Sequence, residues 1–411
     1  MRILHTSDWH LGRTLEGRSR LHEQEEFLNQ LCDIASSENV DVVLVAGDVF
    51  DSFNPPAAAE ELYYDVLERL SAGGTRAVVV IAGNHDSPDR IHAANPLAVK
   101  HGISLIGYPG EDLGTGGPPD GARRIRSGRG WLEVFSPKCG ETVFLVTLAY
   151  PSESRLNECL SDSLDERERQ AAYSDRVAAL LRSSLSAASE NSARLVVGHL
   201  YTAGGWESDS ERQIQLGGAL AVQPNVFADV NYVALGHLHR PQAVANSGVP
   251  CRYSGSPLAY SFSEADQQKE VVLVDVNGRK TTTVTPLKIT CGKPLKKWVS
   301  NSLQEVLEWC ADPRNQNCWV ELELTRDQPL TASEVDMLRR AHPGLVNIRW
   351  RSSVQPDIHE EKRVSELSLV DRFKLFCERK GIQPDQELLD LFLELVNQDN
   401  EEAEANETVE S

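Results

Sequence analysis

Short apolar runs rich in valine, leucine and isoleucine recur along the first part of the chain, and most of them end at residues that can bind metal ions. Runs of this kind predict buried β-strands. They lie at residues 3–4, 42–46, 77–82, 195–197 and 232–235. Because side chains that follow parallel strands gather at the carboxyl edge of a sheet, we expect the polar residues after these runs to lie at one edge of one sheet.

Amphipathic helices are predicted between the first strands. Apolar residues recur at helical spacing over Leu21–Ala35 and Ala57–Leu70, and Pro88 opens a third helix. This alternation predicts an α/β fold with a largely parallel sheet. Alternating segments at 242–254 and 271–285 predict β-hairpins of a second sheet, which would complete an α/β sandwich.

The segment 107–130 is rich in glycine and proline and contains Arg123, Arg124, Arg126 and Arg129. It is either a mobile surface loop or an arm that contacts phosphates, and the sequence leaves both interpretations open. Beyond it, the pattern predicts an antiparallel strand pair at 131–136 and 142–149, and a polar helix at 165–188.

The pattern changes near residue 286. Helix-like segments at 298–310 and 332–341 alternate with strand-like segments at 319–325 and 346–351, which predicts a small α+β domain. This domain contributes no cluster of metal-binding residues.

Residues 367–396 are predicted to form two short helices, each with an apolar stripe. Such stripes must be buried, either against the same chain or against the helices of a partner. The last residues are acidic without basic residues, which is typical of a disordered tail. The predicted organisation is a domain at 1–285, a small α+β domain at 286–353, a helical segment at 354–398 and an acidic tail at 399–411.

The composition is that of an ordinary protein without a membrane span. The chain has 411 residues, and no apolar stretch approaches the roughly 20 residues that cross a membrane. No signal peptide is recognisable, and the eight cysteines include no CxxC pair, so we expect a reduced, cytoplasmic protein. The net charge of -20 argues against a nucleic-acid partner. Part of that charge belongs to the tail and part to carboxylates that cations would neutralise, so a nucleic-acid partner stays open.

Seven of the residues after the predicted strands can bind metal ions: Asp8, His10, Asp48, Asn84, His199, His237 and His239. Mixed nitrogen and oxygen ligands suit manganese, iron or zinc better than magnesium or calcium. One catalytic zinc takes about three protein ligands, so this set predicts two ions bridged by a carboxylate. Two ions about 3.5–4 Å apart bind a phosphate and produce hydroxide at neutral pH.

His85 lies between Asn84 and Asp86. A histidine that binds no metal and is oriented by a neighbouring carboxylate can protonate a leaving alkoxide or stabilise the transition state. We therefore predict that His85 is catalytic and that Asp86 supports it.

The order of the motifs Asp-x-His, Gly-Asp, Gly-Asn-His-Asp, Gly-His and Gly-His-x-His resembles that of the calcineurin-like metallophosphoesterases. Flanking residues are similar, more narrowly, to the nuclease subunits of bacterial SbcC–SbcD complexes; they lie at 1–12, 47–51, 236–242, 253–258 and 260–265. The resemblance implies a metallophosphoesterase β-sandwich flanked by helices and a capping domain at 286–353. It also implies C-terminal helices that dock on the coiled coil of an SbcC-type ATPase.

The resemblance further implies roles for single residues. Asp8, His10, Asp48 and His239 would hold one ion, and Asp48, Asn84, His199 and His237 the other. The implied ions are two Mn²⁺, with Mg²⁺ as the alternative. DNA phosphates are expected to contact Arg13, Arg18, Arg20 or Arg240, each of which could equally be solvated or ion-paired. Asp51 stands where archaeal and eukaryotic relatives have histidine, which leaves its role open.

The implied activity is hydrolysis of DNA in recombination, replication and repair, as a 3′→5′ exonuclease on double-stranded ends and an endonuclease on hairpins or single strands. The implied assembly is a homodimer that joins the ATPase in a heterotetramer, with no membrane. No GxxxxGK[ST] loop is present, so ATP dependence would come from the partner. Two alternatives are a phosphoesterase for a small phosphodiester or a phosphoprotein, which needs no C-terminal module, and an inactive DNA-end scaffold, which needs no intact ligands.

Overall fold

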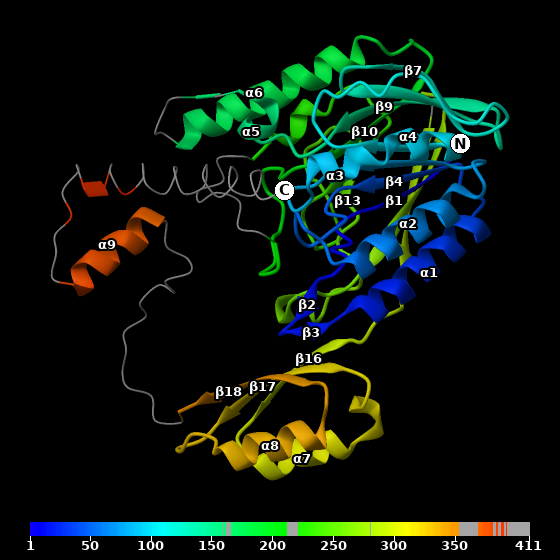
Figure 1. The fold of residues 1–411 in the computed structure, drawn as a ribbon. Helices are drawn as coiled ribbons and strands as arrows, with labels where there is room; N and C mark the ends of the chain where they lie inside the picture. The colour runs from blue at the N-terminus through cyan, green and yellow to red at the C-terminus, as the bar shows by residue number, and fades with distance from the viewer. Residues whose placement is uncertain are drawn as a thin grey trace. The chain divides into compact units, whose positions relative to one another are not determined.

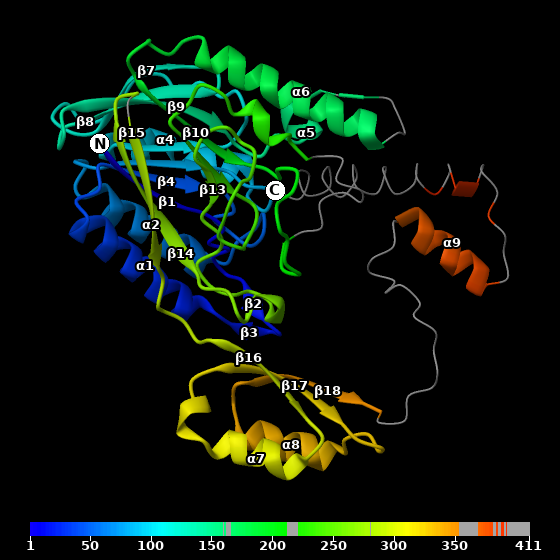
Figure 2. The same cartoon turned by 180° about the vertical axis from the view of Figure 1, so that it is seen from behind.

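The structure is a computed structural model that describes residues 1–158, 160–161, 166–211, 221–279, 281–352, 369–380, 384, 388–389 and 392 (Figures 1 and 2). Contacts between residues divide the chain into two units. One contains residues 1–212 and 219–353, and the other contains residues 213–218 and 354–411.

A six-stranded sheet in the first unit has the order β15-β14-β1-β4-β5-β6. Its strands are β1 (Arg2–Thr6), β4 (Val42–Ala46), β5 (Ala77–Ile81), β6 (Ile103–Ile106), β14 (Glu270–Asn277) and β15 (Thr281–Lys288). The four strands β1, β4, β5 and β6 are parallel, as predicted. β14 pairs antiparallel with β1 and with β15. The hairpin predicted at 271–285 therefore exists, but it extends this sheet rather than forming a second one.

A seven-stranded sheet has the order β12-β13-β11-β10-β9-β8-β7. Its strands are β7 (Arg123–Gly128), β8 (Trp131–Ser136), β9 (Glu141–Leu148), β10 (Ala193–His199), β11 (Tyr232–Gly236), β12 (Gln242–Ala243) and β13 (Cys251–Tyr253). The antiparallel pairing of β8 with β9 confirms the predicted strand pair. β7 lies within the segment that was expected to be a loop, and it pairs antiparallel with β8.

Helices cover the outer faces of the two sheets. They are α1 (Leu21–Ser37), α2 (Ala57–Ser71), α3 (Pro88–Ala93), α4 (Asn95–Ala98), α5 (Glu153–Leu156) and α6 (Glu166–Leu185). A short hairpin, β2 (Thr14–Leu15) with β3 (Arg18–Ser19), precedes α1. Figure 1 shows α1 and α2 on one side of the strands and α6 on the opposite side.

The core consists of three apolar layers, because successive residues of a strand face opposite sides of its sheet. Val43 belongs to the same buried cluster as Leu31 of α1. Leu44 faces the other way and shares a cluster with Leu195 of the second sheet. Val196 lies in the third cluster, which includes residues of α6. The predicted α/β sandwich is thus confirmed, with the two sheets face to face.

A smaller layer follows β15 in the first unit. Its parallel strands have the order β16-β17-β18. The elements are β16 (Leu295–Ser300), α7 (Leu303–Ala311), β17 (Trp319–Thr325), α8 (Ala332–Ala341) and β18 (Leu345–Arg351). The predicted α+β character is present, and α7 and α8 lie together on one face of the sheet (Figure 2). The helix predicted from residue 298 begins only at Leu303, because 298–300 belong to β16.

The second unit contains α9 (Leu369–Arg379) among its described residues. The ring of Phe373 stacks on that of Phe392, with centroids 3.9 Å apart. Phe376, by contrast, is 56% exposed. Most of the second predicted helix and the whole acidic tail lie outside the described residues. No helix in the described part of the chain is both long and apolar enough to span a membrane.

Candidate metal centre

The predicted ligands follow strands of both sheets, so the expectation of a single sheet was wrong. Asp8, Asp48 and Asn84 follow β1, β4 and β5, whereas His199 ends β10 and His237 follows β11. Backbone hydrogen bonds join the loops after β1 and β4, from Asp8 N to the carbonyl oxygen of Gly47 (2.9 Å) and from His10 N to that of Asp48 (3.0 Å). The site therefore forms where the carboxyl ends of two facing sheets meet.

Four of the candidate ligands have left-handed backbone conformations. The φ angles are 54° at Asp8, 45° at His10, 50° at Asp48 and 105° at His237. Non-glycine residues adopt such angles at a cost, and they do so mainly at functional sites. Hydrogen bonds to carboxylates hold two of the loops: His85 N donates to Asp48 Oδ1 (2.8 Å), and His237 N donates to Asp8 Oδ1 (2.9 Å).

Gly83, which precedes Asn84, must be a glycine because there is no room for a side chain, and its backbone angles do not require one. A Cβ atom on Gly83 would lie 2.1 Å from Asp48 Oδ1. Gly47, by contrast, has a φ of 87°, which favours glycine. Both glycines therefore allow the loops after β4 and β5 to approach each other closely.

The side chains of all seven predicted ligands lie together. The metal-binding atoms of Asp8, His10 and His239 lie within 4.8 Å of one another, and so do those of Asp48, His199 and His237. Both clusters are buried.

Asp48 connects the two clusters, and Asn84 joins the two histidines of the second cluster. Asp48 Oδ2 lies 3.6 Å from His10 Nε2 and 3.4 Å from His199 Nε2. The amide oxygen of Asn84 lies 2.9 Å from His199 Nε2 and 2.9 Å from His237 Nδ1. A carboxylate placed between two sets of ligands is suited to bridge two cations.

The orientation of the histidine rings fits metal binding. His199 Nδ1 lies 2.8 Å from the carbonyl oxygen of Ala46. Because a carbonyl only accepts hydrogen bonds, Nδ1 carries the proton and Nε2 presents a lone pair to the cluster. His10 Nε2 and His239 Nε2 face each other at 2.9 Å. Two facing imidazole nitrogens need a shared proton or a cation between them.

Charged groups in the site shift one another's pKa. Burial raises the pKa of Asp8 to about 6. Burial opposes the charged form of His199, yet the Asp48 carboxylate raises the pKa of this histidine to about 9. Burial also lowers the pKa of His237 to about 3. Without a cation, the Asp48 carboxylate thus favours a second proton on His199, at Nε2. A bound cation would take the place of that proton.

A buried chain of polar groups orients His239, and no local sequence pattern indicated it. His239 Nδ1 lies 2.5 Å from Ser210 Oγ, which in turn donates to Glu264. Lys269 Nζ donates to Glu264 Oε2 (2.5 Å) and to the carbonyl oxygen of His239 (2.9 Å). Burial disfavours the charged form of Glu264, but the ammonium group of Lys269 and the ring of His239 hold its pKa well below the usual range.

His85 lies against the first cluster. Its ring centroid is 4.7 Å from that of His10, and the two rings are nearly perpendicular. His85 Nδ1 lies 2.8 Å from the carbonyl oxygen of Asp51. The carboxylate of Asp51 lies 3.4 Å from His10 Nδ1, so Asp51 contacts both rings.

Asp86 supports the site through the backbone of two loops. Its carboxylate accepts hydrogen bonds from the backbone N–H groups of Gly83 (2.8 Å), Val49 (3.1 Å) and Phe50 (2.8 Å). The contact recorded for Nδ1 of the His85 ring is with the carbonyl oxygen of Asp51. Asp86 joins the loops after β4 and β5.

Arg155 supports the same loop, although sequence patterns did not indicate it. Its guanidinium donates to the carbonyl oxygens of Gly83 and Asp86, both at 2.7 Å. These carbonyls bracket Asn84 and His85, so Arg155 holds both ends of this loop. Nothing in the local sequence distinguishes Arg155 from an ordinary surface arginine.

The arginines predicted to contact phosphates have different environments. Arg13 donates to the carbonyl oxygen of Ser210 (2.7 Å) and lies 3.4 Å from the Asp51 carboxylate. Arg18 is exposed, whereas Arg20 is 1% exposed and paired with Glu23, which makes the expectation for Arg20 wrong. Arg240 is exposed directly after His239.

The arginines of 107–130 are largely occupied within the protein. Arg124 is 7% exposed and donates to the carbonyl oxygen of Gly114 (2.9 Å) and to Ser104 Oγ (2.9 Å). Arg126 pairs with Glu133 at 3.1 Å. The suggested phosphate-binding arm is therefore wrong for Arg124, whose side chain instead fixes the fold of this segment.

Comparisons with known proteins agree with this geometry. Residues 1–241 match the family model of calcineurin-like phosphoesterases, and residues 291–381 match one described as the type 5 capsule protein repressor C-terminal domain. The SbcD subunit of the SbcCD nuclease of Bacillus subtilis (strain 168) is 45% identical, covering 98% of this chain and 99% of that protein. The protein of the same name from Escherichia coli (strain K12) is 28% identical, and the match covers 95% of this chain and 97% of that protein. A solved dimetal phosphatase from Danio rerio has a TM-score of only 0.39 at 14% identity, covering 71% of this chain and 99% of that one, which is too low a likeness to support an inference.

The fold, the two Asp/His clusters and the family match define the class: the chain belongs to the calcineurin-like phosphoesterases and is an enzyme of that class. Within this class it belongs to the family of the SbcD subunits of SbcCD nucleases. The resemblance found in the sequence motifs is thereby confirmed.

Proposed function

We propose that this chain is the Mn²⁺-dependent DNA nuclease subunit of an SbcC–SbcD-type complex. The observation that carries the proposal is the pair of buried Asp/His clusters with Asp48 between them. The names of the relatives, which are nuclease subunits, support the choice of DNA as the substrate. The proposed reactions are 3′→5′ exonuclease cleavage of double-stranded ends and endonuclease cleavage of hairpins or single strands, in DNA recombination, replication and repair.

The residues that would hold the ions follow from the two clusters. Asp8, His10, Asp48 and His239 would hold one cation, and Asp48, Asn84, His199 and His237 the other. Two bound divalent cations would polarise the phosphodiester and lower the pKa of a bound water. The chain's own contribution is to orient the ligands through Ala46, Ser210 and the loop contacts of Asp86 and Arg155.

His85 would act on the leaving group. Because the carbonyl of Asp51 only accepts hydrogen bonds, the His85 proton facing it stays on Nδ1. Nε2 would therefore be the ring nitrogen that exchanges a proton with the substrate. In the proposed reaction, Nε2 gives a proton to the leaving sugar oxygen or stabilises the charge that develops there.

The proposed assembly is a homodimer in a heterotetramer with an SbcC-type ATPase that has a coiled coil, located in the cytoplasm. The helical segment at 354–398 would dock on the coiled coil, and the exposed ring of Phe376 on α9 is consistent with a partner. The domain at 286–353 would act as a capping domain that helps to position DNA.

A direct test compares two substrates with the full-length protein. Labelled hairpin DNA and a chromogenic phosphodiester are each incubated with Mn²⁺, with and without the ATPase partner. We expect cleavage of the DNA and its loss on chelation. Cleavage of only the small ester would instead identify a small-molecule phosphoesterase, and cleavage of neither would favour an inactive DNA-end scaffold.

The identity of the metal is tested separately. Protein stripped of metal is titrated with Mn²⁺ and Mg²⁺, and both binding and cleavage are measured. Histidine-rich ligand sets favour Mn²⁺ over Mg²⁺, so we expect tighter binding and faster cleavage with Mn²⁺. Equal binding of the two ions would contradict the assignment of manganese.

A further inference from the structure

An exposed indole lies on a fixed backbone next to the candidate metal centre. Trp206 is 68% exposed, although large apolar side chains usually avoid water. Its backbone N–H donates to Gln242 Oε1 (2.9 Å), and Gln242 Nε2 donates to the Trp206 carbonyl oxygen (2.9 Å). The side chain of Gln242 therefore holds both the N–H and the carbonyl group of Trp206, and the indole extends from this fixed backbone.

Arg240 connects this indole to the metal-binding residues. Its guanidinium carbon lies 5.3 Å from the centroid of the Trp206 ring, in a cation–π arrangement. Arg240 directly follows His239, and Gln242 Nε2 also donates to the Arg240 carbonyl oxygen (3.1 Å). The same loop that presents Trp206 continues to Glu211, which accepts a hydrogen bond from His239 N (2.7 Å).

The charges around Trp206 favour a base over a phosphate as the group that it contacts. Glu207 and Asp209 follow Trp206 in the chain, and their carboxylates would repel a phosphate placed beside the indole. The face of a nucleobase is uncharged and stacks on aromatic rings in a largely sequence-independent way. The arrangement therefore suits an unpaired base whose phosphates lie elsewhere.

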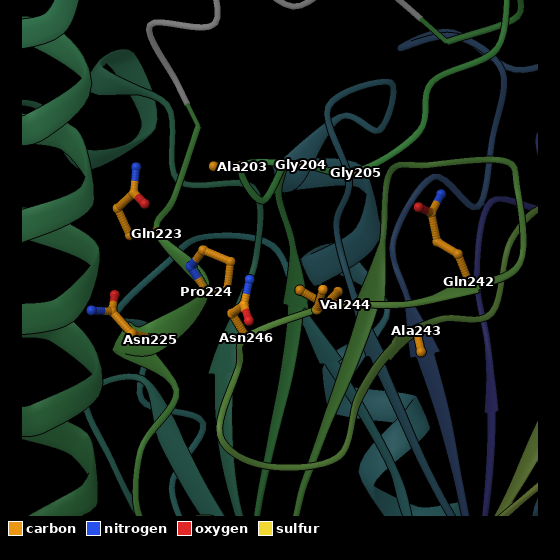
Figure 3. A pocket seen from close by; sticks show the side chains of 11 residues that line it. Ala203, Gly204, Gly205, Gln223, Pro224, Asn225, Gln242, Ala243, Val244 and Asn246 are labelled. Atoms are coloured by element: carbon orange, nitrogen blue, oxygen red, sulfur yellow. The ribbon is translucent and has the colours of Figure 1, made fainter.

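A pocket of about 360 Å³ begins at Gly205 and Gln242. Figure 3 shows its lining, in which the amide side chains of Gln223, Asn225 and Asn246 lie on the side away from Gln242. The described residues that line it carry no charge. Amide groups donate and accept hydrogen bonds, as the edges of nucleobases do, so the pocket fits an uncharged polar group such as the base of a nucleotide.

We propose that Trp206 and Arg240 form a stacking site for an unpaired base of the DNA substrate, and that the amide-lined pocket receives the adjacent nucleotide. This proposal rests on the proposed nuclease function and deepens it. The stacking site would hold a frayed end or a hairpin loop beside the candidate metal centre. It would thereby favour substrates with unpaired nucleotides over fully paired DNA.

The experiment measures binding of a single-stranded oligonucleotide that contains 2-aminopurine, with full-length protein in EDTA so that no cleavage occurs. Stacking quenches the fluorescence of this base. Trp206→Ala should weaken binding by about 5- to 150-fold, since one base–aromatic stack contributes about 1–3 kcal/mol. Trp206→Phe keeps an aromatic face and should retain most of the affinity and the quenching.

Two controls separate stacking from other effects. Leu97→Ala removes an apolar side chain that is also 68% exposed, and it should leave binding unchanged. The loss in Trp206→Ala should be the same at about 50 mM and about 200 mM salt, because stacking releases no counterions. Arg240→Ala should reduce both the affinity and the quenching, because its guanidinium contacts the Trp206 ring, and unchanged quenching would remove Arg240 from the stacking site.

The outcomes distinguish this proposal from the function on which it rests. If the wild type cleaves DNA and Trp206→Ala binds the oligonucleotide as tightly as the wild type does, the stacking site is wrong and the nuclease function stands. If the wild type neither binds nor cleaves DNA, the nuclease function fails and the stacking site fails with it. Asn225→Ala tests the pocket, and unchanged affinity for a longer overhang would remove the pocket from the proposal.

Discussion

At the scale of single residues, His85 differs from the other histidines of the site because it belongs to neither of the clusters that contain Asp8 and Asp48. Its ring lies beside His10 and is held by the carbonyl of Asp51. The metal-binding atoms of His10, Asp51 and His85 also lie within 4.8 Å of one another. We nevertheless propose that the two buried clusters bind the cations and that His85 transfers protons.

His85→Ala should therefore retain Mn²⁺ binding and lose about 10²- to 10⁴-fold in the rate of DNA cleavage, the usual range for a general acid or base. Calorimetry gives the affinity, and a gel assay of labelled DNA gives the rate. His22→Ala is the matched control, since the His22 side chain is 83% exposed. A variant that cleaves at the wild-type rate would show that His85 is not catalytic.

Ser210→Ala tests the chain of polar groups that orients His239. The substitution removes the hydrogen bond to His239 Nδ1 but leaves the Glu264–Lys269 pair in place. Groups that orient a metal-binding histidine contribute about 10- to 100-fold to metal affinity, so calorimetric titration with Mn²⁺ should show a loss of that size.

The control for this experiment is Ser37→Ala, which changes an exposed serine at the end of α1. Both variants are checked for an unchanged melting temperature before titration. Wild-type Mn²⁺ affinity in Ser210→Ala would mean that the contact does not position His239.

Candidate ligands were easier to predict from the sequence than the residues that orient them. Asp8, Asp48 and His199 could be predicted because each lies at the end of an apolar strand. Ser210 and Glu264 act through a contact that spans 54 residues of sequence, and no local pattern marks such a pair. Asp86 shows the same limit, since its carboxylate accepts hydrogen bonds from Val49 and Phe50, which lie 36 to 37 positions earlier in the sequence.

At the scale of elements, the strands were predicted closely, but their distribution between sheets was not. A strand-end position shows that a residue lies at the carboxyl edge of a sheet, and it does not show which sheet. β10 and β11 pair in parallel, with His199 opposite Gly236. This register places the candidate ligands of the second sheet at the same height along its carboxyl edge. Only the packing of the apolar faces between the sheets places this set against the first.

Glu23 joins α1 to the small α+β layer. Its carboxylate accepts hydrogen bonds from Trp319 Nε1 (2.9 Å) and from Lys293 N (2.7 Å), and it pairs with Arg20 at 2.6 Å. Burial raises the pKa of Glu23, but the hydrogen bond and charge of Arg20 outweigh burial, so the net pKa lies below its usual value.

Glu23→Gln should lower the free energy of unfolding by about 1–3 kcal/mol at pH 7, because charged hydrogen bonds are lost and Arg20 stays buried. A lowered pKa in the folded state stabilises the protein above the ordinary glutamate pKa, and this stabilisation is lost as the pH falls below it. The difference between the wild type and Glu23→Gln should therefore shrink between about pH 5 and pH 3. Urea unfolding measures this difference in the free energy of unfolding. A difference that becomes larger as the pH falls would contradict the lowered pKa of Glu23. Glu68→Gln, an exposed site on α2, is the control.

At the scale of the whole molecule, net charge was a poor guide to function. A charge of -20 is unusual for a protein proposed to cleave DNA. The buried clusters offer a way to reconcile this charge with the proposed function, because two divalent cations would bring four positive charges to the place where a substrate phosphate would bind.

Deletion of residues 360–411 tests the proposed docking segment. The shortened protein should lose binding to the ATPase partner, because it lacks α9, and it should retain Mn²⁺-dependent cleavage of DNA by residues 1–353. Pull-down with the partner and the hairpin assay measure the two properties. Deletion of 399–411 alone is the control and should leave partner binding unchanged. If the protein that lacks residues 360–411 still binds the partner, the proposed docking role of the segment at 354–398 is wrong.

The facing pair of His10 and His239 has a further consequence for the synthesis of the protein. These residues are separated by 229 positions in the sequence, and Glu264, which orients His239 through Ser210, follows later still. The candidate centre therefore cannot assemble on the ribosome until almost two thirds of the chain has emerged and both sheets have packed. A nascent chain that already carries every candidate ligand of the first sheet still lacks the histidines of the second, so translation itself delays completion of the candidate centre.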